Sequence, residues 1–175
     1  DTLPFVRPGD LEIMAVSTDF LGINYYSRAV CRSESIPEDE NDPQEVFASD
    51  DVTDMGWEVS PKGLTDILVR LERDYGSQDL YVTENGCAYP TGPDADGRIR
   101  DVERQRYFES HAAACLDAIE QGVPLRGYFA WSLMDNFEWA YGYEKRFGLV
   151  HVDYETQERT LKDSAHTYRN IISRN

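Results

Sequence analysis

The chain has 175 residues, of which 33 are acidic and 17 basic, so its formal net charge is −16. Hydrophobic residues make up 41% of the sequence, which is enough for a folded core and argues against a disordered acidic tail. The negative charge repels nucleic-acid backbones and anionic membrane surfaces, so neither kind of partner is expected. No apolar run of about eighteen residues is present and no secretory leader is visible, which favours a cytoplasmic location without a membrane span.

The three cysteines, Cys31, Cys87 and Cys115, lie far apart and include no C-x-x-C pair. This odd, scattered set predicts neither a disulfide framework nor a zinc site, and it fits a reducing compartment. His111 and Cys115 share a helix face four residues apart, but no second pair of ligands accompanies them. The sequence therefore predicts no metal site and no cofactor.

The first predicted strand covers Phe20–Tyr26. It is apolar or aromatic at nearly every position, which is typical of a strand that is covered on both faces. The segment Ser33–Asp54 follows, with nine acidic residues and no basic one. We interpret this segment as a solvated excursion, and a binding tail is the alternative.

The remaining predicted elements alternate between helices and strands. The next predicted element is a helix that ends before Gly76. Its apolar residues recur every three to four positions, and this face is expected to bury Leu64, Ile67, Leu68, Leu71 and Tyr75. In chain order the others are a strand at Leu80–Glu84, a helix near Asp101–Gln121, a strand at Gly127–Trp131, a hairpin ending near Arg159, and a helix at Lys162–Ser173 that buries Ala165, Tyr168, Ile171 and Ile172.

The order of strands and helices predicts an α/β fold with a parallel sheet and right-handed crossovers. Loops after helices are short and loops after strands are long, which is typical of a (β/α)₈ TIM barrel with its chemistry at the strand ends. A doubly wound open sheet gives a similar order, but no Gly-rich phosphate loop follows any strand. Because a whole barrel takes about 250 residues, residues 1–175 are expected to form a single partial barrel domain of about three βα units.

The residues at the predicted strand ends are chemically distinctive: Asn24 and Tyr26, then Glu84, then Trp131. A carboxylate at the end of a buried strand costs several kcal/mol to desolvate unless it is hydrogen-bonded or paired. Glu84 is therefore a candidate functional residue, with a salt-bridged structural carboxylate as the alternative. An ionised nucleophile needs hydrogen-bond donors, and Tyr26 is a plausible one; a buried phenol bonded to a carbonyl is the alternative.

The loop after the third strand is rich in aromatic residues. Eight of the twenty residues from Tyr128 to Phe147 are aromatic, and Asp135, Asn136 and Glu138 lie between them. Flat rings beside carboxylates and amides suit a sugar, which has an apolar C–H face and a rim of hydroxyls. Ordinary core packing is the alternative, but the interleaved acids favour a ligand surface.

Four ordered motifs carry a resemblance to a known family. Tyr81–Gly86 contains T-E-N-G, Asp19–Tyr26 fits D-F-x-G-x-N-Y-Y, and Trp131–Trp139 fits W-S-L-x-D-N-F-E-W with Arg146–Leu149 following. The spacing of Asp101, Arg104, Tyr107 and His111 agrees as well. These motifs resemble family-one glycoside hydrolases, the retaining β-glucosidases, and especially actinobacterial members.

The resemblance implies a role for each matching residue and a β-glucoside or cello-oligosaccharide as the substrate. Glu84 would be the nucleophile that forms a glycosyl-enzyme ester, and Tyr26 would hydrogen-bond to it. The substrate-binding residues would be Asn24 beside the other carboxylate, Trp131 against the sugar, Glu138 at the 4- and 6-hydroxyls, Trp139 at the 3- and 4-hydroxyls, and Phe147 at the 6-position.

One essential part of this chemistry is missing from the sequence. Retaining hydrolysis needs two carboxyl groups roughly 5–5.5 Å apart. The family carries its acid/base glutamate in an N-E-P segment, and this chain has only Asn41-Asp42-Pro43, in the wrong part of the barrel order. The chain therefore resembles a C-terminal portion, with the N-terminal portion of the same enzyme as its expected partner. Alone it is expected to be inactive and prone to associate through its open sheet edges.

Two other functions stay open. A 6-phospho-β-glucosidase would need cations near the 6-position, where Glu138 would repel a phosphate; Lys145 and Arg146 are the only nearby basic pair. A non-catalytic carbohydrate-binding fragment would use the aromatic residues alone. The intact T-E-N-G argues against it, because binding needs no ionised carboxylate beneath the anomeric carbon.

Overall fold

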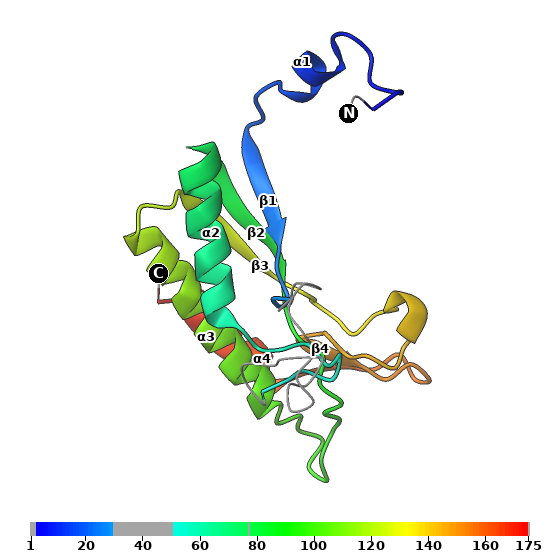
Figure 1. Cartoon of the computed structure of the whole chain (residues 1–175). Coiled ribbons are helices and arrows are strands. Elements are labelled where there is room, and N and C mark those ends of the chain that lie inside the picture. The colour runs from blue at the N-terminus through cyan, green and yellow to red at the C-terminus, as the bar shows by residue number, and fades with distance from the viewer. Residues whose placement is uncertain (1–2, 30–50, 77, 175) are drawn as a thin grey trace, which may run out of the picture.

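The protein is built on a three-stranded parallel sheet (Figure 1). The computed structural model describes residues 3–29, 51–76 and 78–174. The sheet has the order β1 (Phe20–Asn24), β2 (Asp79–Asn85) and β3 (Leu125–Ala130). A separate antiparallel pair, β4 (Val150–Val152) and β5 (Arg159–Leu161), forms the predicted hairpin. Cys31 and most of the acidic segment Ser33–Asp54 lie outside the described residues.

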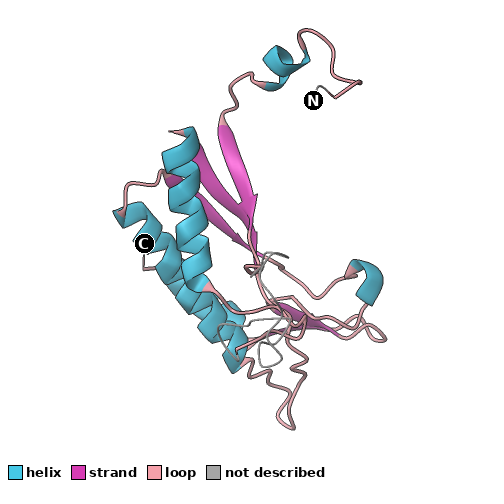
Figure 2. Ribbon diagram, in the orientation of Figure 1, coloured by secondary structure: helices cyan, strands magenta, loops and turns pink. Residues whose placement is uncertain are grey.

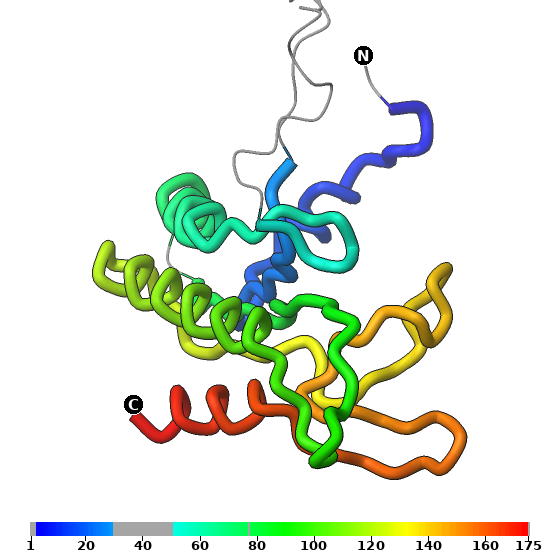
Figure 3. Tube along the Cα trace, turned by 90° about the horizontal axis from the view of Figure 1, so that it is seen from below, coloured from blue at the N-terminus to red at the C-terminus, as the bar shows by residue number. Residues whose placement is uncertain are grey.

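Three helices cover one face of the sheet: α2 (Pro61–Tyr75), α3 (Val102–Glu120) and α4 (Asp163–Ile172). They lie side by side in chain order along one side of the molecule (Figure 3). The short helices α1 (Asp10–Met14) and η1 (Trp139–Tyr141) lie away from this layer. The predicted alternation of strands and helices is confirmed.

The main core lies between the sheet and the first two helices. Leu64 and Leu68 of α2 and Val82 of β2 are fully buried, and Leu80 lies beside them. Because strand side chains alternate between the two faces, Leu80 and Val82 both point beneath the helices. Each buried aliphatic side chain contributes about 1.5–3 kcal/mol to stability. The apolar period predicted for α2 therefore identifies its core face correctly.

Three expectations of burial are wrong in the described chain. Phe20 of β1 is 53% exposed, because β1 is an outer strand and no described helix covers the second face of the sheet. Tyr75 is 78% exposed at the last position of α2, and Ile172 is 56% exposed at the end of α4. The continuous apolar pattern of β1 predicts that both of its faces are covered, but the described helices cover only one face of the sheet.

A buried ion pair holds α4 against α3. The Arg104 guanidinium donates to Asp101 at 2.6 Å, and both side chains are fully buried. Asp101 also accepts from the main-chain N–H of Ser164 at 2.9 Å, at the start of α4. A second Arg104 nitrogen donates to the Arg146 carbonyl at 2.6 Å. The pair thus fixes the start of α4 and the loop beyond β3 relative to α3.

The loops differ in length at the two ends of the sheet (Figure 2). The links from α2 to β2 and from α3 to β3 are a few residues long, whereas long loops follow β2 and β3. The long loops meet the hairpin where the parallel strands end (Figure 2). This arrangement brings residues far apart in the sequence together at the carboxyl ends of the strands.

Candidate active site

A β-bulge determines where Glu84 points. Ile23 of β1 pairs with Val82 of β2, and the next residue of β1, Asn24, pairs with Glu84. Thr83 is therefore an extra residue in β2, with no counterpart in β1. Strict alternation from Val82 would place Glu84 on the same face, beneath the helices, and the bulge breaks this alternation. The Thr83 hydroxyl donates to Asn24 Oδ1 at 2.7 Å, which ties the two strand ends together.

A close approach of β2 and β3 follows directly after Glu84. The Trp131 N–H donates to the Asn85 carbonyl at 2.8 Å. A Cβ atom on Gly86 would lie 1.7 Å from the Trp131 carbonyl oxygen, so only glycine fits at this position. Gly86 therefore allows the main chain at Trp131 to lie directly against the end of β2.

Tyr26 and Glu84 form a short hydrogen bond. The Tyr26 hydroxyl donates to Glu84 Oε2 at 2.6 Å, a distance typical of a bond to an ionised carboxylate. Burial raises the pKa of Tyr26, and the hydrogen bond to Glu84 and the charges of Glu84 and Glu138 raise it further. The phenol therefore stays protonated and acts as a donor. The structure brings together the two residues for which the sequence analysis predicted this contact.

Glu138 belongs to the same electrostatic environment. It lies in the loop after β3, immediately before η1, and is partly buried. Burial raises the pKa of Glu138, and the charge of Glu84 adds to the effect. Glu84 in β2 thus raises the pKa of a carboxyl group in the loop after β3, and such coupling is typical of functional sites.

The predicted aromatic residues occupy three different environments. Trp131 is partly buried at the end of β3, and Trp139 is 82% exposed in η1. Phe147 is only 1% exposed, and its ring packs edge-on against Tyr26 with 6.1 Å between centroids. Phe147 therefore packs against Tyr26, the hydrogen-bond donor to Glu84. Its contact with the 6-position of a sugar stays a prediction.

Trp57 is a residue near the site that the sequence analysis missed. Its ring lies 5.4 Å from that of Tyr26 and 6.3 Å from that of Phe147. Trp57 lies in the segment before α2, and a single tryptophan there forms no periodic pattern that would predict a strand or a helix. Only the folded chain brings it beside Tyr26.

Asp135 is not the ligand group that the sequence pattern suggested. Its buried carboxylate accepts from Lys162 at 2.8 Å, from Arg146 at 2.8 Å and from the Gly148 N–H at 2.9 Å. Burial alone would raise the pKa of Asp135, but the Lys162 charge and these hydrogen bonds hold it below its usual value. The same burial lowers the pKa of Lys162 to about 8, so its ammonium group stays mostly protonated at neutral pH. Asp135 therefore has a structural role at the base of the loop.

The basic pair beside the aromatic loop is already engaged by carboxylates. Lys145 donates to Asp54 at 3.0 Å, and Arg146 binds Asp135. A sugar phosphate would have to compete with both carboxylates for these cations. The geometry therefore favours an unphosphorylated ligand.

His111 and Cys115 form no metal site. Among the described residues, no group of three or more His, Cys, Asp or Glu side chains could hold a metal ion. His111 Nδ1 lies 2.8 Å from the Tyr107 carbonyl, and burial lowers the pKa of His111 to about 4. Burial also raises the pKa of the Cys115 thiol to about 12. Both are neutral core residues.

Among the described residues, no helix is long and apolar enough to cross a membrane.

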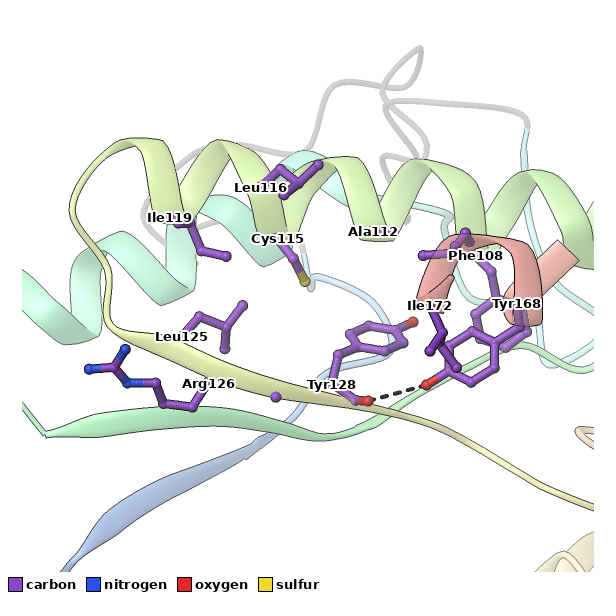
Figure 4. A pocket seen from close by; sticks show the side chains of 12 residues that line it. Phe108, Ala112, Cys115, Leu116, Ile119, Leu125, Arg126, Tyr128, Tyr168 and Ile172 are labelled. Carbon is purple, nitrogen blue, oxygen red and sulfur yellow. Dashed lines mark hydrogen bonds between the residues drawn. The ribbon is translucent and has the colours of Figure 1, made fainter. Parts of the chain in front are cut away.

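An apolar cavity of about 330 Å³ lies away from these carboxylates, between α3, β3 and α4 (Figure 4). Phe108, Cys115 and Leu125 contribute to its lining, and the Tyr168 hydroxyl donates to the Tyr128 carbonyl at 3.2 Å at one side. No carboxylate lines it. The cavity therefore belongs to the packing of the helices on the outer face of the sheet, and the candidate active site is the strand-end cluster.

Together, the parallel βα units and the carboxylates at their strand ends define a part of a (β/α)₈ barrel with an active-site edge. The sequence model described as "Glycosyl hydrolase family 1" matches residues 1–175. The chain belongs to glycosyl hydrolase family 1, and the predicted resemblance is confirmed.

Relatives and solved structures agree with this assignment. The chain is 43% identical over 176 residues to "Beta-glucosidase A" of Thermotoga maritima, covering 99% of this chain and 38% of that protein. It is 45% identical over 187 residues to "Bifunctional beta-D-glucosidase/beta-D-fucosidase" of Bifidobacterium breve, covering 97% and 40% respectively. The structure matches the Thermotoga maritima β-glucosidase bound to a methoxycarbonyl-substituted glucoimidazole with a TM-score of 0.84 at 42% identity, covering 94% of this chain and 37% of that one. The prediction of a partial TIM barrel is thus confirmed.

Proposed function

We propose that this chain carries the nucleophile of a retaining β-glucosidase that acts on terminal non-reducing β-D-glucosyl residues. The observation that carries the proposal is the 2.6 Å hydrogen bond from Tyr26 to Glu84 at the strand ends. The relatives named above are β-glucosidases, and the chain spans about 38% of the length of the first of them.

In the proposed reaction Glu84 attacks the anomeric carbon while the bond from this carbon to the aglycone oxygen breaks. A general acid gives its proton to the departing oxygen, and a glycosyl ester forms on Glu84. Water then attacks the same carbon, the ester bond breaks, and the deprotonated acid takes a proton from the water. Tyr26 holds one oxygen of the carboxylate, which leaves the other free to attack.

The general acid/base is proposed to come from the N-terminal portion of the same enzyme, together with the strands that complete the barrel. Residues 1–175 would form one partial domain within that barrel. In the described chain β1 and β3 each have only one neighbouring strand, and the face opposite the helices exposes Phe20. Because open edges and apolar faces favour association, these surfaces suit the missing strands.

The substrate-binding roles follow the same proposal. Asn24 would lie beside the acid/base, and Trp131 would pack against the sugar ring. The hydroxyls and the 6-position would be bound by Glu138, Trp139 and Phe147. The engagement of Lys145 by Asp54 supports a plain glucoside or cello-oligosaccharide over a 6-phosphoglucoside.

Covalent trapping tests the proposal. The chain is assembled with its N-terminal portion and treated with a 2-deoxy-2-fluoro-β-glucoside that carries a dinitrophenolate leaving group; the fluorine slows hydrolysis of the ester. We expect mass spectrometry to find one fluoroglucosyl group on the peptide that contains Glu84. A label on another carboxylate would overturn the assignment, and no label at all would favour a carbohydrate-binding fragment.

The isolated chain provides the matching control. Without the general acid it should not hydrolyse an aryl β-glucoside at a measurable rate, although it retains Glu84. Robust turnover by the purified chain would show that an acid/base is present within these 175 residues and would contradict the proposed division of the site.

A further inference from the structure

A buried polar network lies directly beneath the Tyr26–Glu84 pair. Its centre is the carboxamide of Asn85, which is fully buried at the end of β2. The amide nitrogen donates to the Tyr25 carbonyl at 2.7 Å and to the Tyr107 hydroxyl at 3.0 Å. The amide oxygen accepts from the Tyr128 hydroxyl at 2.5 Å. Asn85 thus connects β2 to the segment after β1, to α3 and to β3.

Tyr107 extends this network to the hydrogen-bond donor of the nucleophile. Its hydroxyl accepts from Asn85 and donates to the Tyr26 carbonyl at 3.3 Å. Its ring stacks on His111 with 3.8 Å between centroids and meets Phe108 edge-on at 5.9 Å. Because the ring is held on two sides, the position of its hydroxyl is set by α3.

The network therefore acts on both members of the pair. The carbonyls of two successive residues, Tyr25 and Tyr26, are fixed by side chains from β2 and α3. Asn85 follows Glu84 directly in the chain, so the same amide fixes the main chain next to the nucleophile. Satisfied buried networks of this kind restrict a structure to one arrangement. An apolar core at this place would need none of these polar groups.

We propose that Asn85 and Tyr107 are positioning residues, which hold the Tyr26 main chain so that its phenol reaches Glu84. This inference rests on the proposed function of Glu84. It assigns the network beneath the strand ends a part in the reaction, although neither residue touches the sugar.

The variant Tyr107→Phe tests the inference in the assembled enzyme, because it removes the hydroxyl and keeps the stacked ring. With a dinitrophenyl β-glucoside we expect kcat to fall about 10-fold, less than the roughly 100-fold cost of a 1 Å displacement. KM should stay close to the wild-type value, because Tyr107 is not proposed to touch the sugar. Tyr128→Phe should act in the same direction through Asn85, and it serves if Tyr107→Phe does not fold.

A double-mutant cycle separates positioning from a structural effect. In a Tyr26→Phe background the donor is already absent, so Tyr107→Phe should lower kcat by less than about 2-fold further. A merely structural role would give the full single-mutant factor in both backgrounds. This result would overturn the inference.

Tyr168→Phe is the matched control. It removes a hydroxyl from α4 that donates to the Tyr128 carbonyl, with no bond to the segment after β1. We expect its kcat to match that of the wild type. If the wild-type enzyme fails to label Glu84 with the fluoroglucoside, the proposed function is wrong. If it labels normally but Tyr107→Phe keeps the wild-type kcat, only the positioning inference fails.

Discussion

Glu84 near the end of β2 and Asp135 in the loop after β3 are both carboxylates, yet their surroundings differ. Asp135 is fully buried and accepts from two cationic side chains and a main-chain N–H. Glu84 is partly buried and accepts at Oε2 from one neutral phenol, and no donor to its Oε1 is found among the described residues. Both oxygens of Asp135 accept hydrogen bonds, whereas only one oxygen of Glu84 does so in the described part of the chain.

The comparison shows that the donors around a carboxylate distinguish a structural role from a chemical one. Two cations hold Asp135 ionised and also fix it in place, so it stabilises the loop. The one phenol beside Glu84 donates to Oε2 and does not block the second oxygen. This difference leads to predictions for each carboxylate.

The largest effect is expected for Glu84→Gln in the assembled enzyme. An amide cannot form the glycosyl ester, so kcat should fall about 10⁴-fold or more, as is typical when a nucleophile is removed. Initial rates with an aryl β-glucoside measure this, and the melting temperature should stay close to that of the wild type. A loss of less than about 10-fold would show that Glu84 is not the nucleophile.

Asp135→Ala should chiefly lower stability. It leaves Lys162 buried without its carboxylate, and breaking a buried ion pair from one side costs about 3–5 kcal/mol. Urea unfolding of the assembled enzyme measures the loss, with Glu84→Gln as the control that leaves the ion pairs intact. A change below about 1 kcal/mol would mean that the cluster contributes little to the fold.

Tyr26→Phe tests the single neutral donor. Hydrogen bonds to charged groups contribute about 1.5–3 kcal/mol, so we expect kcat to fall roughly 10- to 100-fold. Initial rates with an aryl β-glucoside measure this loss. A wild-type kcat would show that the hydrogen bond from Tyr26 to Glu84 has no part in the reaction.

The lowered pKa of Asp135 makes stability depend on pH. Because the pKa in the folded state lies below the unfolded value of 3.8, this contribution is present above about pH 4 and is lost as the pH falls further. Melting temperatures of the wild type and Asp135→Asn should therefore differ most at neutral pH and converge below pH 4. A constant difference down to about pH 3 would contradict the assignment.

The smallest effect is expected for an exposed ion pair. Lys62 and Asp66 lie four residues apart on α2 at 2.6 Å, and both side chains are largely exposed. Such pairs contribute about 0.3–0.5 kcal/mol, so Lys62→Ala should barely change unfolding in urea. A loss as large as that of Asp135→Ala would show that burial is not what separates the two ion pairs.

Much of the fold and part of the candidate site could be predicted from the sequence. The apolar period of α2 identified Leu64 and Leu68 as core residues, because helix periodicity is local. The T-E-N-G motif placed Glu84 at a strand end, and Tyr26 followed from a second motif. Element order and family were therefore encoded in short stretches of chain, each of which has its own pattern.

Only the tertiary structure decided which carboxylate is structural and which can react. Lys162 lies 27 residues from Asp135, and Tyr107 lies 81 residues from the Tyr26 carbonyl that it binds. The bulge at Thr83 and the burial of Phe147 depend in the same way on neighbouring elements. Periodicity fixes the face on which a side chain lies, whereas its donors, charge and exposure depend on residues that only folding brings near.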